Sequence, residues 1–370
     1  MGKIVAILSM QKVLNYGSYL QAFALKQLLL NNGASEVYFI DIKPGKQLPG
    51  FSDGDQVNSN FISKIRSAIL SSNLISKIKD FFFIRQVYKD IVKNYDRLGL
   101  NDSCPSNFDL AVVGSDEVFN CCQYSTWGYT LQLYGDIPEA KDVISYAASF
   151  GHTTLEQLSN LGIDYEIGKT LSTMSNISVR DDNSRIIVKS LTDIDPQVNV
   201  DPVLAYGYNK EIESYTVETK DRYIVLYSYH TRISDKNEIN RIIRFAKEKN
   251  LKVYSIFCRY DWCDKAILPD SPFEVLVWIN KADYVITDTF HGTVFSIITH
   301  SQFATIVRDS NRNKLVSLLE HFGLTDRIID THKEEFNTTF NKKIDYTHVD
   351  SILDSDRNNT NTYLRNHLTD

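Results

Sequence analysis

The feature that most constrains the fold of this chain is a regular alternation of short apolar runs with helical patterns. Near the start, an apolar run (3–10) precedes apolar positions at helical spacing (20–28) and a second β-rich run (36–42). Strands that alternate with helices build parallel sheets with helices on both faces. Four more apolar runs of strand type follow in the first half, at 110–113, 143–147, 177–180 and 198–202.

The second half of the chain starts the same alternation afresh. Residues 205–221 are polar and patternless, which indicates an interdomain linker. Beyond it, the patterns predict strands at 223–229, 252–257, 284–287 and 303–307, and helices at 235–249, 272–281, 292–300 and 311–322.

We therefore predict an α/β protein with two Rossmann-like domains whose parallel sheets face a central cleft. The N-terminal domain spans 1–205 and the C-terminal domain 206–335, and a chain of 370 residues is long enough for both. The tail, 336–370, ends in a helical pattern that can pack back on the first domain. In this fold ligands bind at the carboxyl ends of the strands, between the domains.

Residues 51–107 interrupt the alternation and are predicted to be a helical insertion in the first domain. Within it, 61–98 hold eight basic and three acidic residues, a charge of +5 in a chain of net charge −6. A basic helical segment can make a peripheral contact with an anionic membrane. The alternative, which we prefer on sequence alone, is a helix with a solvated basic face.

The composition excludes several classes of protein. A net charge of −6 argues against nucleic-acid binding, which needs a basic surface. Five cysteines without metal-type spacing predict neither a disulfide framework nor a metal site. The start of the chain lacks a signal-peptide core, and no apolar run reaches the length of a membrane span. We therefore expect a cytoplasmic protein, with the inner face of the membrane as a further location if the basic segment binds lipid.

The strongest candidate for chemistry is the segment 282–293, ADYVITDTFHGT. Its apolar strand leads into a short turn, and we expect a helix to begin at about Gly292. This brings His291 to the strand's carboxyl end, beside the N-terminus of a helix, where an anion and an acid/base can meet. Asp288 could orient the imidazole or cap the helix, and its spacing favours the cap. A purely structural histidine is the alternative.

Three other places combine a strand end with polar residues. Arg180 follows an apolar strand, so its guanidinium should point toward the cleft, although a surface pair with Asp181 is equally open. The predicted strand at 110–113 is followed by Gly114, Ser115 and Asp116. This is a weak signal for a site, because small-residue turns that end in Asp are common. Asn15, after the first strand, is best explained as a helix cap.

The order of these pieces resembles the polysaccharide pyruvyl transferase family. The resemblance covers about residues 3–325 and rests on NYG with LQA, VGSD, SYAAS, SVRD, DP and DTFHG, in that order. It implies a fold like that of B-type glycosyltransferases. It also implies phosphoenolpyruvate as donor, with no cofactor, and a sugar diol as acceptor, which a lipid can carry, to give a pyruvate ketal in surface or extracellular polysaccharide synthesis.

The resemblance also implies roles for individual residues. His291 would be the acid/base and Arg180 a ligand of the donor anion. Some members have arginine two residues before this histidine, where the present chain has Thr289. The remaining expected donor ligands are then Thr289 itself, Gly292, Thr293, Arg308 and Arg312, with Asp288 in support. The expected residues on the acceptor side of the cleft are Asn15, Gly17, Gln21, Ser115 and Asp116.

Two other functions remain open on sequence grounds. A nucleotide-sugar glycosyltransferase on the same fold would need a carboxylate for the ribose, for which Asp283 or Glu274 are the available residues. A non-catalytic sugar-binding protein would not release phosphate from phosphoenolpyruvate.

Overall fold

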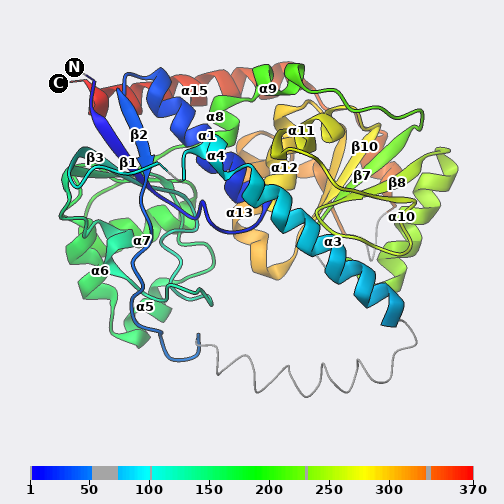
Figure 1. The fold of residues 1–370 in the computed structure, drawn as a ribbon. Coiled ribbons are helices and arrows are strands. Elements are labelled where there is room, and N and C mark those ends of the chain that lie inside the picture. Colours follow the sequence, from blue (N-terminus) through cyan, green and yellow to red (C-terminus); the bar gives the residue numbers. More distant parts are fainter. Residues whose placement is uncertain (1, 52–73, 101, 230–231, 331–334, 370) are drawn as a thin grey trace.

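The structure, a computed structural model, describes residues 2–51, 74–100, 102–229, 232–330 and 335–369. It contains two parallel sheets with helices packed around them (Figure 1). The first sheet has the order β2-β1-β3-β4-β5-β6 and the second the order β12-β11-β10-β7-β8-β9. The predicted fold class, two Rossmann-like α/β domains as in B-type glycosyltransferases, is confirmed by this topology.

The elements of the first half follow the predicted alternation. Its strands are β1 (Ile4–Leu8), β2 (Glu36–Phe39), β3 (Phe108–Asp116), β4 (Ala140–Ala148), β5 (Ser178–Val179) and β6 (Gln197–Val198). Its helices are α1 (Tyr16–Asn31), α3 (Leu74–Lys93), α4 (Tyr95–Leu98), α5 (Leu155–Leu161), α6 (Asp164–Leu171), α7 (Asp182–Thr192), α8 (Pro202–Tyr206) and α9 (Asn209–Ser214).

The elements of the second half form the other sheet and its covering helices. Its strands are β7 (Tyr223–Tyr227), β8 (Lys252–Ile256), β9 (Lys265–Ile267), β10 (Tyr284–Thr287), β11 (Phe303–Ile306) and β12 (Ile328–Ile329). Its helices are α10 (Lys236–Glu248), α11 (Pro272–Asn280), α12 (Phe290–Ile298), α13 (Arg312–His321) and α14 (Phe336–Phe340), followed by α15 (Tyr346–Leu368).

The expected strand at 198–202 is wrong beyond Val198. Asp201 instead begins helix α8, because its carboxylate accepts a hydrogen bond from the backbone N–H of Val203 at 3.0 Å. Pro202 then occupies the first helical position, where its fixed φ suits a helix and its missing N–H costs nothing. This local start brings the Asp201 side chain to the interior, where it is 1 % exposed.

The last helix, α15, lies against the first domain although it follows the second domain in sequence (Figure 1). The Tyr363 hydroxyl donates to the backbone oxygen of Ser145 in β4 at 2.7 Å. The Lys3 ammonium donates to the backbone oxygen of His367 at 2.9 Å. Through these contacts the C-terminal helix packs on the sheet that contains the first strand of the chain.

Part of the basic segment 61–98 lies outside the described residues, which resume at Leu74. The described part is α3 and α4, a helical stretch that packs on both domains. Within the ranges that the structure describes, no helix is long and apolar enough to cross a membrane.

Candidate functional site

A cavity of about 310 Å³ lies between the two domains. Its walls come from residues that follow the carboxyl ends of strands in both sheets, the position at which this fold binds ligands. The first domain contributes Asn15, Ser18, Asp116 and Glu117, and the second contributes Arg232, Thr289, Phe290, His291 and Lys314.

His291 lies in the first turn of α12 and lines this cavity. The helix begins at Phe290, two residues earlier than expected, because the Thr289 hydroxyl caps it by accepting from the N–H of Gly292 at 2.9 Å. The prediction that Asp288 is the cap is therefore wrong. Asp288 is fully buried, and its carboxylate accepts from the guanidinium of Arg308 at 3.5 Å. Burial raises the pKa of Asp288, and the neighbouring arginines only partly oppose this rise.

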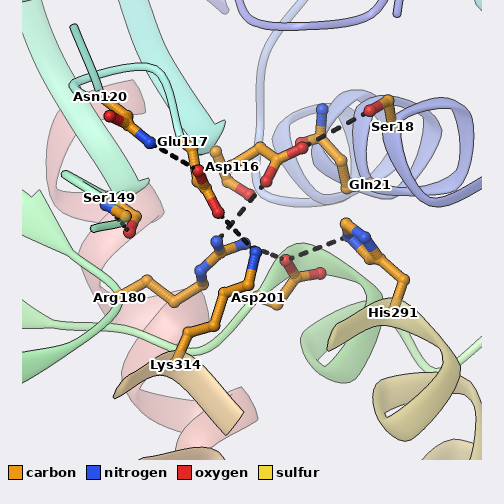
Figure 2. A network of polar contacts seen from close by, with 12 residues as sticks. Ser18, Gln21, Asp116, Glu117, Asn120, Ser149, Arg180, Asp201, His291 and Lys314 are labelled. Carbon is orange, nitrogen blue, oxygen red and sulfur yellow. Dashed lines mark hydrogen bonds and ion pairs between the residues drawn. The ribbon is translucent and has the colours of Figure 1, made fainter. Parts of the chain in front are cut away.

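The imidazole of His291 faces the buried carboxylate of Asp201 (Figure 2). Nε2 of His291 lies 3.7 Å from Oδ2 of Asp201, which is an ion-pair distance and too long for a hydrogen bond. Burial alone would raise the pKa of Asp201, but the adjacent His291 and Arg180 outweigh burial and hold this pKa below its usual value. Asp201 is therefore an anion positioned to orient the imidazole.

The other side of the imidazole faces Gly17 in the first turn of α1. A β-carbon added at Gly17 would lie 2.3 Å from Nδ1 and 2.5 Å from Cγ of His291. No side chain fits this distance, so glycine allows the α1 backbone to approach the histidine. Gly17 and His291 thus form a direct contact between the two domains.

Arg180 lies behind the cavity, with its side chain 4 % exposed. Its Nη1 donates to Asp201 at 2.9 Å, and its Nη2 lies 3.5 Å from Asp116 (Figure 2). The guanidinium also stacks on the ring of Phe290, 4.3 Å from the centroid. Although burial opposes the charge, the surrounding carboxylates, Asp116 first, raise the pKa of Arg180. Its Nε and Nη2 are buried and have no hydrogen-bond partner among the residues that the structure describes.

An ion pair between Glu117 and Lys314 joins the two domains across the cavity (Figure 2). Asn120 donates a further hydrogen bond to Glu117 at 2.8 Å. Burial alone would raise the pKa of Glu117, but Lys314 and Asn120 outweigh burial and lower this pKa to about 2. The Lys314 ammonium is thereby fixed at the cavity wall, 5.9 Å from the centroid of the Phe290 ring.

The structure brings together some of the predicted acceptor-side residues. Asn15 caps α1 by accepting from the N–H of Ser18 at 2.7 Å, and it also lines the cavity. Asp116 lines the cavity as well and adopts a left-handed φ of 71°, a strained value for a non-glycine residue. Gln21 and Ser115 are fully buried behind this wall.

The other predicted donor ligands lie away from the cavity wall. Arg308 is held by Glu238 at 2.8 Å and by Asp288, and Arg312 is exposed beside Asp309. Thr293 is fully buried and shares a hydrogen bond with Thr305 at 3.1 Å. A β-carbon on Gly292 would lie 2.1 Å from the hydroxyl of Thr287, so this glycine serves the packing of α12 on β10.

The sequence alone did not point to Asp201, Glu117, Arg232 and Lys314 as site residues. Asp201 belongs to the DP motif, which carries no role in the sequence analysis, so its place in that motif was the available signal. Arg232 lies over the ring of Tyr229, 4.8 Å from the centroid, and gave no signal of its own.

A second cavity, of about 240 Å³, adjoins the first. The two share Phe290 and Lys314 as common wall, and Arg180 and Asp201 line only the second cavity. In the part of the chain that the structure describes, no group of three metal-ligating side chains comes together.

The fold is that of a two-domain α/β protein, and His291 lines a cavity between the two domains. Comparison with known families matches residues 15–310 to the family described as "Polysaccharide pyruvyl transferase". The chain belongs to this family, and it is a transferase. No curated protein matches the sequence.

Among solved structures, the chain is similar to UDP-N-acetylglucosamine 2-epimerase from Rickettsia bellii, with 10% identity over 98% of this chain and 96% of that chain and a TM-score of 0.48. It is also similar to an α,α-trehalose-phosphate synthase (UDP-forming) from Burkholderia vietnamiensis, with 7% identity over 99% and 98% of the two chains and a TM-score of 0.46. Similarities this low say nothing about what the present chain binds.

Proposed function

We propose that this protein transfers the three-carbon unit of phosphoenolpyruvate to two hydroxyls of a sugar and releases phosphate. The observation that carries the proposal is the position of His291, which faces a cavity between the domains with buried Asp201 behind its imidazole. Cations at the same cavity, Lys314 and Arg232, suit a donor that carries a carboxylate and a phosphate.

The reaction requires proton transfers in opposite directions, one to carbon and one from each of two hydroxyls. The methylene carbon of phosphoenolpyruvate gains a proton and becomes a methyl group, and the central carbon then forms bonds to both sugar oxygens while its bond to phosphate oxygen breaks. The two hydroxyls lose one proton each, so that one proton replaces the proton given to carbon and the other leaves with phosphate. Because imidazole gains and loses a proton near neutral pH, His291 can serve in both directions.

The neighbouring residues have supporting roles in this proposal. Asp201 orients the imidazole. Lys314, fixed by Glu117, faces the charge that develops on the departing phosphate, and Arg180 adds positive charge from the adjoining second cavity. On the first domain's side, Asn15, Ser18 and Asp116 offer polar groups to the sugar hydroxyls.

The contacts of Asp283 and Glu274 disfavour the rival nucleotide-sugar glycosyltransferase. Asp283 precedes β10, at the end of the strand opposite to His291, and it is paired with Arg222. Glu274 accepts from the backbone N–H of Asp270 at 3.1 Å and does not line the cavity. Neither carboxylate is available in the cleft for a ribose.

Incubation with phosphoenolpyruvate and a panel of aryl glycosides in deuterated water tests the proposal. We expect phosphate release that depends on the glycoside, and a ketal methyl group that contains one deuterium from solvent. Phosphate release without a glycoside would indicate a phosphatase. Release of nucleotide from a nucleotide sugar, with none of phosphate from phosphoenolpyruvate, would replace the proposal by the glycosyltransferase.

A further inference from the structure

Helix α3 presents an outward face on which large apolar side chains alternate with bases. Phe81 and Phe82 are 62 % and 61 % exposed, although phenylalanine is normally among the buried residues. The spacing of the exposed residues places them on one side of the helix. These residues are Ile78, Phe81, Phe82, Tyr88 and Val92 among the apolar ones, and Lys79, Arg85, Lys89 and Lys93 among the bases.

Neither acidic residue of α3 is among the exposed residues of this face. Asp80 forms an ion pair with Arg259 of the second domain at 2.7 Å. Asp90 is partly buried and accepts from Gln86 at 2.9 Å, and burial raises its pKa. The exposed residues from Ile78 onward therefore include four bases and no acid, and Asp90 lies near two of these bases, Lys89 and Lys93.

The opposite face of α3 anchors the helix firmly to the protein. Phe83, Val87 and Ile91 are buried in the main hydrophobic core. The chain continues into Asn94, whose backbone oxygen accepts from the hydroxyl of Tyr19 in α1 at 2.9 Å. The outward aromatic residues are thus held in place and are not the product of a loosely packed helix.

Helices α3 and α4 contact loops at the carboxyl ends of strands in both domains, the sheet edges at which the cavity lies. Arg259, the partner of α3 at one end, follows the carboxyl end of β8 in the second domain. At the other end, the hydroxyl of Tyr95 donates to the backbone oxygen of Lys12, which follows the carboxyl end of β1. Figure 1 shows α3 running from α4 toward the second domain.

We propose that the outward face of α3, from Ile78 to Lys93, binds an anionic membrane surface. Aromatic and aliphatic side chains can enter the interface while long basic side chains reach the phosphates of the lipid headgroups. The attraction acts on the four exposed bases of this face. Bound in this way, the protein turns the cleft side toward the membrane, where a lipid-carried acceptor would be found. The inference stands independently of the proposed reaction.

Sedimentation with vesicles tests this surface without any need for activity. The full chain should bind vesicles of equal parts phosphatidylglycerol and phosphatidylcholine, fail to bind pure phosphatidylcholine, bind more weakly as salt rises, and be released only above physiological salt. Arg85→Gln/Lys89→Gln should weaken binding about thirtyfold, at about a tenfold loss per 1.4 kcal/mol and about 1 kcal/mol per base. Phe81→Ser/Phe82→Ser should abolish binding that persists at physiological salt.

The matched control is Lys210→Gln/Lys220→Gln, which removes two exposed bases elsewhere and should bind as the parent does. Melting temperatures and phosphate release should be unchanged in all three variants. Equal binding to both vesicle types, or parental binding by both α3 variants, would overturn the proposal. Gel filtration that shows a dimer, lost in the α3 variants while no variant or parent binds vesicles, would assign the face to a second copy instead.

Discussion

Gly17 and His291 lie so close that a single β-carbon on Gly17 would overlap the imidazole, at 2.3 Å from Nδ1. The two residues belong to different domains, α1 of the first and α12 of the second. The backbone of Gly17 therefore contacts the Nδ1 side of the imidazole, and the carboxylate of Asp201 faces its Nε2 side. The imidazole is held between a backbone and a carboxylate.

Gly17→Ala should remove activity without unfolding the protein. Alanine favours a helix by about 1 kcal/mol over glycine, but its methyl group must displace His291 from its place. A displacement of this order costs about a hundredfold in rate when the displaced group takes part in catalysis. Acceptor-dependent phosphate release and the melting temperature of the same variant measure the two effects.

Gly168→Ala provides a matched control for crowding alone. Its β-carbon would lie 2.5 Å from the backbone oxygen of Leu191, in the first domain and away from the cavity. This variant should melt earlier and turn over normally in its folded fraction. If Gly17→Ala also melts earlier and turns over normally, the contact between Gly17 and His291 is not needed for catalysis.

His291→Gln should lower turnover by about a hundredfold or more, the usual contribution of a general acid or base. The loss should appear in kcat more than in the KM of phosphoenolpyruvate, because a proton-transfer role acts in the transition state. The control is His300→Gln, which removes a half-exposed histidine paired with Asp350 at 2.9 Å. An unchanged melting temperature together with near-parental turnover would exclude His291 as the catalyst.

The fold could be predicted because each strand and each helix carries its own local pattern. Two helix starts were predicted wrongly, for different reasons. Asp288 and Thr289 are both good helix caps. The spacing could not show that the Asp288 side chain is instead buried and contacts Arg308. At Asp201, the apolar residues before it were extended into a strand although Asp-Pro is also a typical helix start.

The site could be predicted only where a residue follows a strand, as His291, Asn15 and Asp116 do. Pairings across the cleft depend on residues far apart in the chain, and no local pattern encodes them. The ion pair of Glu117 with Lys314 is one such pairing. The same reason explains why Arg308 was expected at the donor although Glu238 holds it elsewhere.

The ion pair between Glu117 and Lys314 should make stability depend on pH in the acid range. The pKa of Glu117 is about 2 in the folded protein and its ordinary value is 4.5, so folding favours the ionised form. This contribution to stability is fully present above pH 4.5 and is lost as the pH falls toward about 2. Glu117→Gln should therefore flatten the pH dependence of the unfolding free energy over this window.

Denaturant unfolding at several pH values measures this effect. Glu156→Gln removes an exposed carboxylate in the first turn of α5 and serves as the control. The control should retain the parental slope between pH 4.5 and pH 2. An identical slope for Glu117→Gln and the parent would mean that the ion pair does not contribute to folding.

Arg180 offers the last prediction, because its guanidinium contacts Asp201, Asp116 and the ring of Phe290 at once. Arg180→Ala leaves the buried carboxylate of Asp201 and the partly buried one of Asp116 without this partner, a loss of about 3–5 kcal/mol, so it tests stability more than binding. Arg180→Lys keeps the positive charge, but an ammonium group cannot reproduce the planar set of N–H donors of a guanidinium. It should raise the KM of phosphoenolpyruvate and rescue only part of the activity that Arg180→Ala loses.

The control for this change is Arg185→Lys, since Arg185 makes a two-point contact with Asp195 on the surface, at 2.7 and 2.8 Å. It should leave the KM of the donor unchanged. Phosphoenolpyruvate should also raise the melting temperature of the parent, because a ligand stabilises the state that binds it, and raise that of Arg180→Lys less. A purely structural arginine would lower the melting temperature of Arg180→Lys but leave the donor-induced shift and the KM at their parental values, and that result would remove Arg180 from the donor site.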